Sequence, residues 1–132
     1  MSAGLARPLE RILYVEDDPD IRAVATLALQ AVGGFTLQVC SSGSEAIEAA
    51  PDFAPDLILI DVMMPSMDGP TTFQALRVLP GTAKTPVVFM TAKVQPSEVA
   101  HYKEMGALDV IAKPFDPMTL AAAVRAIYEK AT

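Results

Sequence analysis

The stretch Leu57-Ile58-Leu59-Ile60-Asp61, followed by Val62-Met63-Met64-Pro65-Ser66-Met67-Asp68-Gly69, decides the fold of this chain. Its first four residues are large and apolar, and such a run is typical of a strand buried on both faces of a parallel sheet. The Asp68-Gly69 pair then indicates a turn, and Pro70 suits the first turn of a helix. Because ligands bind at the carboxyl ends of strands in open α/β sheets, Asp61 occupies a position suited to chemistry.

Composition limits the possible classes of protein. The chain has 132 residues, which is the length of one domain, and its 52% hydrophobic and 20% charged residues are typical of a globular protein. A formal net charge of −6 argues against a phosphate-binding surface, so we expect no direct contact with nucleic acid. A single cysteine excludes an internal disulfide. The amino terminus does not resemble a signal peptide and no apolar run is long enough to span a membrane, so we expect a cytoplasmic location without membrane contact.

Strand-like and helix-like stretches alternate along the whole sequence. Four further apolar stretches predict strands, at residues 12–15, 36–39, 87–90 and 110–112. Helical spacing or helix-start signals follow each strand, at 18–32, 42–50, 71–78, 96–105 and from Asp116-Pro117 onward. Five such βα units predict an α/β fold, in which one parallel sheet has helices on both faces. We expect residues 1–8 to form a flexible tail and residues 9–132 to form the domain.

Polar residues follow four of these predicted strands. They are Glu16, Asp17 and Asp18 after the first strand, Asp61 after the third, Thr91 after the fourth and Lys113 after the fifth. Crowded carboxylates repel one another and require a cation, and Mg²⁺ prefers oxygen ligands of this kind. A carboxylate beside Mg²⁺ can attack phosphorus, while a lysine and a hydroxyl can bind the phosphoryl oxygens. We interpret Asp18 as the cap of the following helix rather than as a ligand.

Four motifs give the chain a clear family resemblance. They are Ile-Leu-Tyr-Val-Glu-Asp-Asp at 12–18, Asp-Val-Met-Met-Pro-Ser-Met-Asp-Gly at 61–69, Thr-Ala at 91–92 and Lys-Pro-Phe at 113–115. In this order, each at the end of a strand, they make the chain resemble a response-regulator receiver domain from about Arg11 to Lys130. The resemblance implies a flavodoxin-like (βα)5 fold with strand order 2-1-3-4-5.

The resemblance also implies a role for each residue of the site. Asp61 would be the phosphoacceptor, Lys113 would pair with the phosphoryl group, and Thr91 would donate a hydrogen bond to it. The ligands of Mg²⁺ would be Glu16, Asp17, Asp61 and the backbone carbonyl of Met63. The Lys113–Pro114 peptide bond would be cis.

One position departs from the pattern of many receivers. Three residues before the lysine, many receivers carry an aromatic side chain that turns inward when the threonine engages phosphate. The corresponding residue here is Val110. The coupling of threonine to an aromatic therefore cannot be transferred to this chain, and a switch would have to involve the 93–96 loop or the helix at 96–105.

We expect a stand-alone response regulator, because the sequence ends at Thr132 without an output domain. It would accept a phosphoryl group from a histidine kinase or a histidine phosphotransfer protein. Its signal would pass to a protein partner through the face formed by the helix at 96–105, the strand at 110–112 and the last helix, and a homodimer is possible. A close variant is a phosphate sink that competes for one kinase. In either case it would not be an enzyme beyond its own phosphorylation and dephosphorylation.

Two other classes of function stay open. A small phosphohydrolase with an aspartate nucleophile usually carries a second aspartate two residues later, but that position here is Met63. A degenerate receiver would serve only as a docking module, but it would be expected to lack part of the acidic set. A phosphatase assay and a Mg²⁺ titration distinguish these classes from a phosphorylated receiver.

Overall fold

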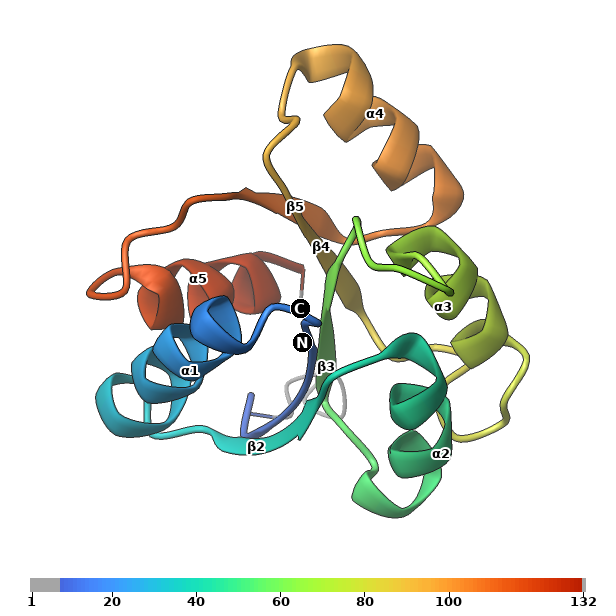
Figure 1. Cartoon of the computed structure of the whole chain (residues 1–132), viewed down its shortest axis with the longest axis horizontal. Helices are drawn as coiled ribbons and strands as arrows, with labels where there is room; N and C mark the ends of the chain where they lie inside the picture. Colours follow the sequence, from blue (N-terminus) through green and yellow to red (C-terminus); the bar gives the residue numbers. More distant parts are fainter. Residues whose placement is uncertain (1–7, 132) are drawn as a thin grey trace.

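The computed structural model describes residues 8–131, and their strands form one parallel sheet (Figure 1). The strand order is β2-β1-β3-β4-β5, as the family resemblance implied. The strands are β1 (Arg11–Val15), β2 (Thr36–Cys40), β3 (Leu57–Asp61), β4 (Val87–Thr91) and β5 (Asp109–Ala112). Of the tail predicted at 1–8, residues 1–7 lie outside the described residues.

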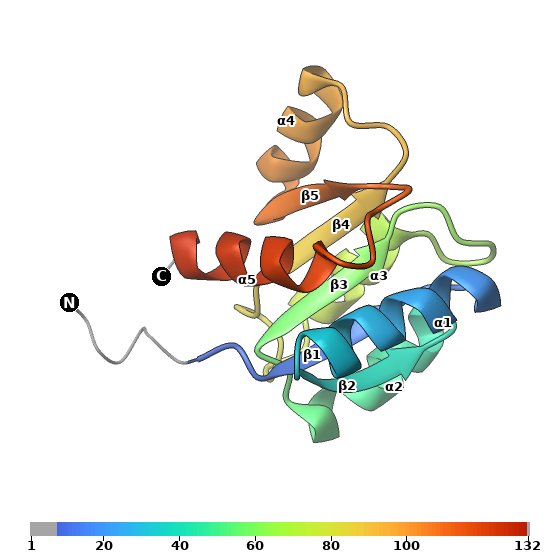
Figure 2. The same ribbon diagram turned by 90° about the vertical axis from the view of Figure 1, so that its left-hand side faces the viewer.

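Helices cover both faces of this sheet. They are α1 (Pro19–Leu27), continued by η2 (Ala28–Val32), then α2 (Gly43–Phe53), α3 (Gly69–Arg77), α4 (Pro96–Met105) and α5 (Leu120–Ala131). One face carries α1 and α5, and the other carries α2, α3 and α4 (Figures 1 and 2). Within residues 8–131, no helix combines the length and the apolar composition that crossing a bilayer requires.

The central strands anchor the site because they are buried from end to end. Every residue of β3 and of β4 is buried, and the apolar ones divide between two clusters, one on each face of the sheet. Leu59 packs toward α1 and α5, whereas Ile58 and Ile60 pack toward α2 and α3. Burying one such side chain stabilises the fold by about 1.5–3 kcal/mol. Asp61, the last residue of β3, therefore extends from a rigid strand.

Side-chain caps begin three helices, and those at Asp18 and Ser42 were predicted. The Asp18 side chain accepts hydrogen bonds from the backbone N–H groups of the first turn of α1. Asp68 does the same for Thr71 in α3, and Ser42 does so for Glu45 in α2. These bonds satisfy N–H groups that have no partner inside a helix, so they fix where each helix begins.

Two helix predictions need correction. The helix predicted to run to residue 32 is α-helical only to Leu27 and continues as a π-helical segment, where the Gly33 N–H donates to the Ala28 carbonyl. Gly33 lies so close to α5 that a Cβ on it would be 2.7 Å from the Cβ of Ala121. The last helix begins at Leu120 rather than at Pro117, because the Asp116 side chain accepts the Met118 N–H and forms a local turn.

Candidate functional site

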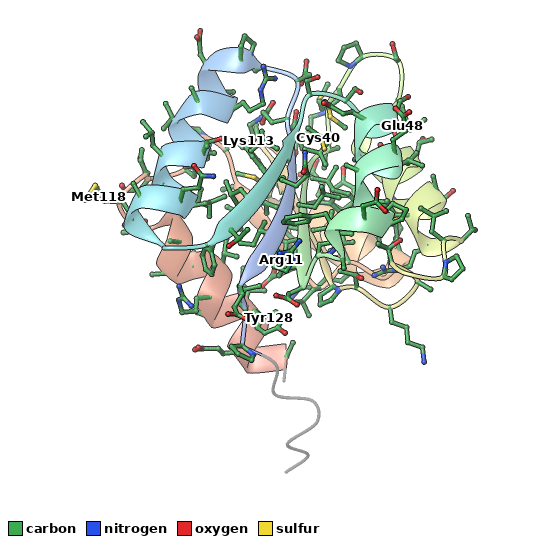
Figure 3. The ribbon with its side chains drawn as sticks, turned by 90° about the horizontal axis from the view of Figure 1, so that it is seen from below. Arg11, Cys40, Glu48, Lys113, Met118 and Tyr128 are labelled. Carbon is green, nitrogen blue, oxygen red and sulfur yellow. The ribbon has the colours of Figure 1, made fainter. Side chains whose placement is uncertain are left out.

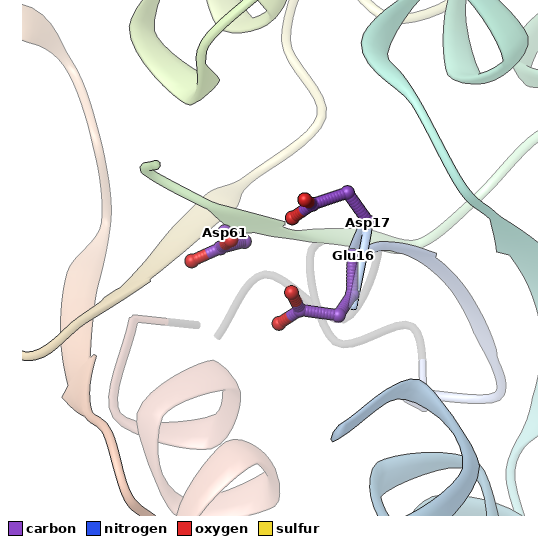
Figure 4. A group of neighbouring side chains, drawn as sticks. All are labelled: Glu16, Asp17 and Asp61. Atoms are coloured by element: carbon purple, nitrogen blue, oxygen red, sulfur yellow. The ribbon is translucent and has the colours of Figure 1, made fainter. Parts of the chain in front are cut away.

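The polar residues predicted to form the site lie together at the carboxyl ends of the strands. Glu16 and Asp17 follow β1, Asp61 ends β3, Thr91 ends β4 and Lys113 follows β5. Figure 4 shows the side chains of the three acids directed into one space. One carboxylate oxygen from each of Glu16, Asp17 and Asp61 lies within 4.8 Å of the others. The sheet thus gathers residues that are far apart in the sequence.

Lys113 connects two of these acids. Its Nζ atom lies 3.0 Å from Oε1 of Glu16 and 3.0 Å from Oδ1 of Asp61. Burial lowers the pKa of Lys113, but hydrogen bonds to Glu16 and Asp61 and the charges of these acids outweigh it and hold the pKa above its usual value. The amine is therefore a fixed positive charge beside Asp61. The Lys113–Pro114 peptide bond is cis, as predicted.

Glu16 is the most deeply buried acid of the group, with 0% of its surface exposed. Burial raises its pKa, the hydrogen bond from Lys113 opposes that effect, and the charge of Asp61 adds to it, so that the pKa reaches about 7. An ionised carboxylate in such a place needs more positive charge than one lysine provides. The site is thus arranged to favour a further cation.

Thr91 is buried, whereas the side chain of Met63 is exposed. Thr91 is only 3% exposed, and its Oγ1 accepts a hydrogen bond of 3.1 Å from the backbone N–H of Lys93. The hydroxyl hydrogen of Thr91 remains able to donate. The Met63 side chain, in the loop after β3, is 70% exposed. The role of its backbone carbonyl as a metal ligand stays a prediction.

Two residues that the sequence analysis did not select hold the loops of the site. Arg22 Nη1 donates to the carbonyl oxygens of Glu16, at 2.8 Å, and Asp17, at 3.2 Å. Gly69 packs so tightly that a Cβ on it would lie 2.6 Å from the Asp61 carbonyl oxygen. The turn signal located Gly69 but gave no sign of this close packing, and Arg22 resembled an ordinary exposed residue of a helix.

The residues present fit a hard divalent cation. All three candidate side-chain ligands are carboxylates, and oxygen is the ligand atom that Mg²⁺ prefers. Lys113, just after β5, pairs with Asp61 at the same edge of the sheet, and the buried Thr91 ends the neighbouring strand β4. This combination lies at the carboxyl end of the central strand of a parallel sheet, which is where ligands bind in open α/β folds.

Comparison with known proteins identifies the family. The family model described as "Response regulator receiver domain" matches residues 12–125, and the chain therefore belongs to this family. It is the receiver domain of a response regulator of two-component signalling, and receiver domains are signalling modules.

Curated relatives are similar over nearly the whole chain. The DNA-binding response regulator MtrA of Mycolicibacterium smegmatis is 40% identical over 117 residues, which are 89% of this chain and 50% of MtrA. The transcriptional regulator RpaA of Synechocystis is 35% identical over 122 residues, which are 92% of this chain and 50% of RpaA. The chain thus spans about half the length of the curated relatives it matches.

Solved structures agree in fold. The chemotaxis response regulator CheY4 of Vibrio cholerae superposes with a TM-score of 0.82 at 29% identity, covering 90% of this chain and 98% of CheY4. A putative response regulator from Chloroflexus aurantiacus gives a TM-score of 0.80 at 32% identity, covering 93% of this chain and 99% of that one.

Proposed function

We propose that this receiver domain accepts a phosphoryl group on Asp61 from a histidine kinase or a histidine phosphotransfer protein, in a reaction that requires Mg²⁺. One observation carries the proposal. A carboxylate at the end of a buried strand lies 3.0 Å from a lysine ammonium and within 4.8 Å of two further acids. This arrangement provides a nucleophile, a positive charge for the phosphoryl oxygens and a set of oxygen ligands for a cation.

Four groups would hold the cation. They are the carboxylates of Glu16, Asp17 and Asp61 and the backbone carbonyl of Met63. When bound, Mg²⁺ would neutralise the carboxylates and the oxygens of the incoming phosphoryl group. Arg22 supports this role indirectly, because it fixes the backbone that carries Glu16 and Asp17.

For phosphoryl transfer, the protein mainly has to position the reacting groups and stabilise the negative charge of the phosphoryl oxygens. An oxygen of the Asp61 carboxylate attacks phosphorus, the phosphorus–nitrogen bond of the phosphohistidine breaks, and the imidazole leaves with that electron pair. The product is an acyl phosphate on Asp61. Lys113 pairs with one phosphoryl oxygen, and Thr91 donates its hydroxyl hydrogen to another.

The output would be a change in protein–protein contact. If the Thr91 hydroxyl turns to the phosphoryl group, it alters its bond to the Lys93 N–H at the start of the loop before α4. Helix α4 has no buried residue and is therefore less restrained by packing than the other helices. We propose that the face formed by α4, β5 and α5 binds the downstream protein or a second copy of the chain. Val110 is half-buried on β5 and contributes no aromatic side chain.

Phosphorylation of the purified chain tests this function. Incubation with Mg²⁺ and acetyl phosphate should add the mass of one phosphoryl group, and omission of Mg²⁺ or the Asp61→Asn substitution should abolish the addition. The matched control is Asp52→Asn, which removes an exposed acid on α2. An unchanged mass of the wild type, with acetyl phosphate and with several phosphorylated histidine kinases, would refute the proposal.

A further inference from the structure

The hydroxyl of Tyr14 is an unusual feature of the core. Tyr14 is 0% exposed, and its hydroxyl has no hydrogen-bond partner among residues 8–131. Its ring packs in the apolar cluster between the sheet and the helices α1 and α5. An unpaired buried hydroxyl destabilises a fold, whereas an apolar residue at the same place would fill the space without that cost.

Tyr14 lies directly behind the phosphorylation site. It lies on β1 two residues before Glu16, whose N–H continues the pairing with β2, so both side chains leave the same face of the sheet. Its partner across the sheet is Leu59, which precedes Asp61 by two residues on β3. Burial raises the pKa of Tyr14, and the charges of Glu16 and Asp61 raise it further.

In the unmodified domain Lys113 donates hydrogen bonds to two carboxylates, and phosphorylation of Asp61 would change this arrangement. Its ammonium group donates to both Glu16 and Asp61. A phosphoryl group lies farther out from the strand than the carboxylate that carries it, so a lysine that follows the phosphoryl oxygens moves away from Glu16. The Glu16 carboxylate is fully buried, and a bound cation would take only one of its two oxygens, so the oxygen that Lys113 leaves would then need another donor. Within residues 8–131, the other hydrogen bond to this carboxylate comes from the Asp18 N–H, at a long 3.3 Å.

We propose that Tyr14 is a positioning residue that donates a hydrogen bond to Glu16, directly or through one water molecule, when Lys113 turns to the phosphoryl group. This inference rests on the proposed function of Asp61. The Tyr14 hydroxyl would then lack a hydrogen-bond partner in the unmodified domain and have one in the phosphorylated domain. This hydroxyl would thereby favour the phosphorylated state without touching the phosphoryl group.

The Tyr14→Phe substitution tests this inference, because it removes only the hydroxyl. Without Mg²⁺ or phosphoryl donor, we expect the midpoint of thermal unfolding to rise by about 3 °C, since an unpaired buried hydroxyl is lost. With Mg²⁺, we expect the dissociation constant for trifluoroberyllate, a stable analogue of a phosphoryl group, to increase about fivefold to tenfold by calorimetry. Loss of a residue with a merely structural role would not raise the stability of the domain and at the same time weaken its binding of the analogue.

The matched control is Tyr128→Phe. Tyr128 belongs to the same apolar cluster but lies at the other end of the strands from Lys113 (Figure 3), and it should leave the trifluoroberyllate affinity unchanged. A Tyr14→Phe variant that binds trifluoroberyllate as tightly as the wild type would overturn the inference alone. A wild type that binds the analogue but accepts no phosphoryl group would overturn only the proposed function. A wild type that binds no analogue would overturn both.

Discussion

The Nζ atom of Lys113 lies 3.0 Å from Oδ1 of Asp61, although 52 positions separate the two residues in the sequence. The lysine follows β5 and the aspartate ends β3, and β4 lies between these strands in the sheet. The long side chain of Lys113 therefore reaches across one strand. This contact requires that β3, β4 and β5 are assembled side by side. The site is therefore complete only when the sheet is folded.

Removal of the lysine charge should destabilise the domain. In Lys113→Met, Glu16 and Asp61 lose their shared ammonium partner in a largely buried place, so the free energy of unfolding at pH 7 should fall by about 3 kcal/mol. The loss should be smaller at pH 5, because protonation of Glu16 relieves the repulsion. Urea unfolding at both pH values measures this difference. The control is Lys103→Met, whose 3.6 Å ion pair with Asp109 is exposed and should contribute about 0–1 kcal/mol.

The ionisation of Glu16 should make stability depend on pH. Its pKa rises from 4.5 to about 7 on folding, so the folded state binds this proton more tightly than the unfolded chain does. The stabilisation is fully present below pH 4.5 and is lost as the pH rises through about 7. In wild type without Mg²⁺, the free energy of unfolding should thus decline across this range relative to Glu16→Gln. Identical pH profiles of the two proteins would show that Glu16 titrates normally.

The same proton should compete with the cation. A carboxylate ligand must be ionised to bind Mg²⁺, so the affinity for Mg²⁺ should weaken as the pH falls below about 7. Calorimetry in buffers of different ionisation enthalpy should detect proton release on Mg²⁺ binding at pH 6.5. If no proton is released in any buffer, Glu16 is already ionised in the metal-free domain.

Gly69 should be essential for the position of Asp61. In Gly69→Ala, the new Cβ would lie 2.6 Å from the Asp61 carbonyl oxygen and 2.9 Å from the Cα of Val62, so the backbone has to shift. We expect a loss of about 1–3 kcal/mol in the free energy of unfolding and slower phosphorylation by acetyl phosphate. Gly81→Ala is the control, because no atom lies within 4 Å of its added Cβ. Equal behaviour of the two variants would mean that the loop before α3 adjusts freely.

The amino-acid pattern predicted the fold well because its signals are local and strong. Apolar runs such as 57–60 identified the central strands, and caps such as Asp18 and Ser42 identified the helix starts. The grouping of Glu16, Asp61 and Lys113 also followed from their places after parallel strands. Strand order came from the family resemblance, because neighbours within a sheet leave no local signal in the sequence.

The remaining features depend on tertiary packing. The π-helical end of α1 reflects the close approach of Gly33 to α5, and the spacing of apolar residues does not contain that information. The buried hydroxyl of Tyr14 was indistinguishable from an ordinary strand aromatic in sequence. The support that Arg22 gives to the acidic loop depends on where its long side chain points. Such contacts become visible only when the elements are assembled.

Chemical localisation of the phosphoryl group tests the central claim most directly. Borohydride reduces an acyl phosphate to an alcohol, so treatment of the phosphorylated wild type should convert residue 61 to homoserine, which peptide mass spectrometry can locate. We expect this conversion at Asp61, and only after incubation with Mg²⁺ and phosphoryl donor. Conversion at another acid, such as Asp17, or phosphorylation that resists borohydride, would contradict the assignment of Asp61 as the phosphoacceptor.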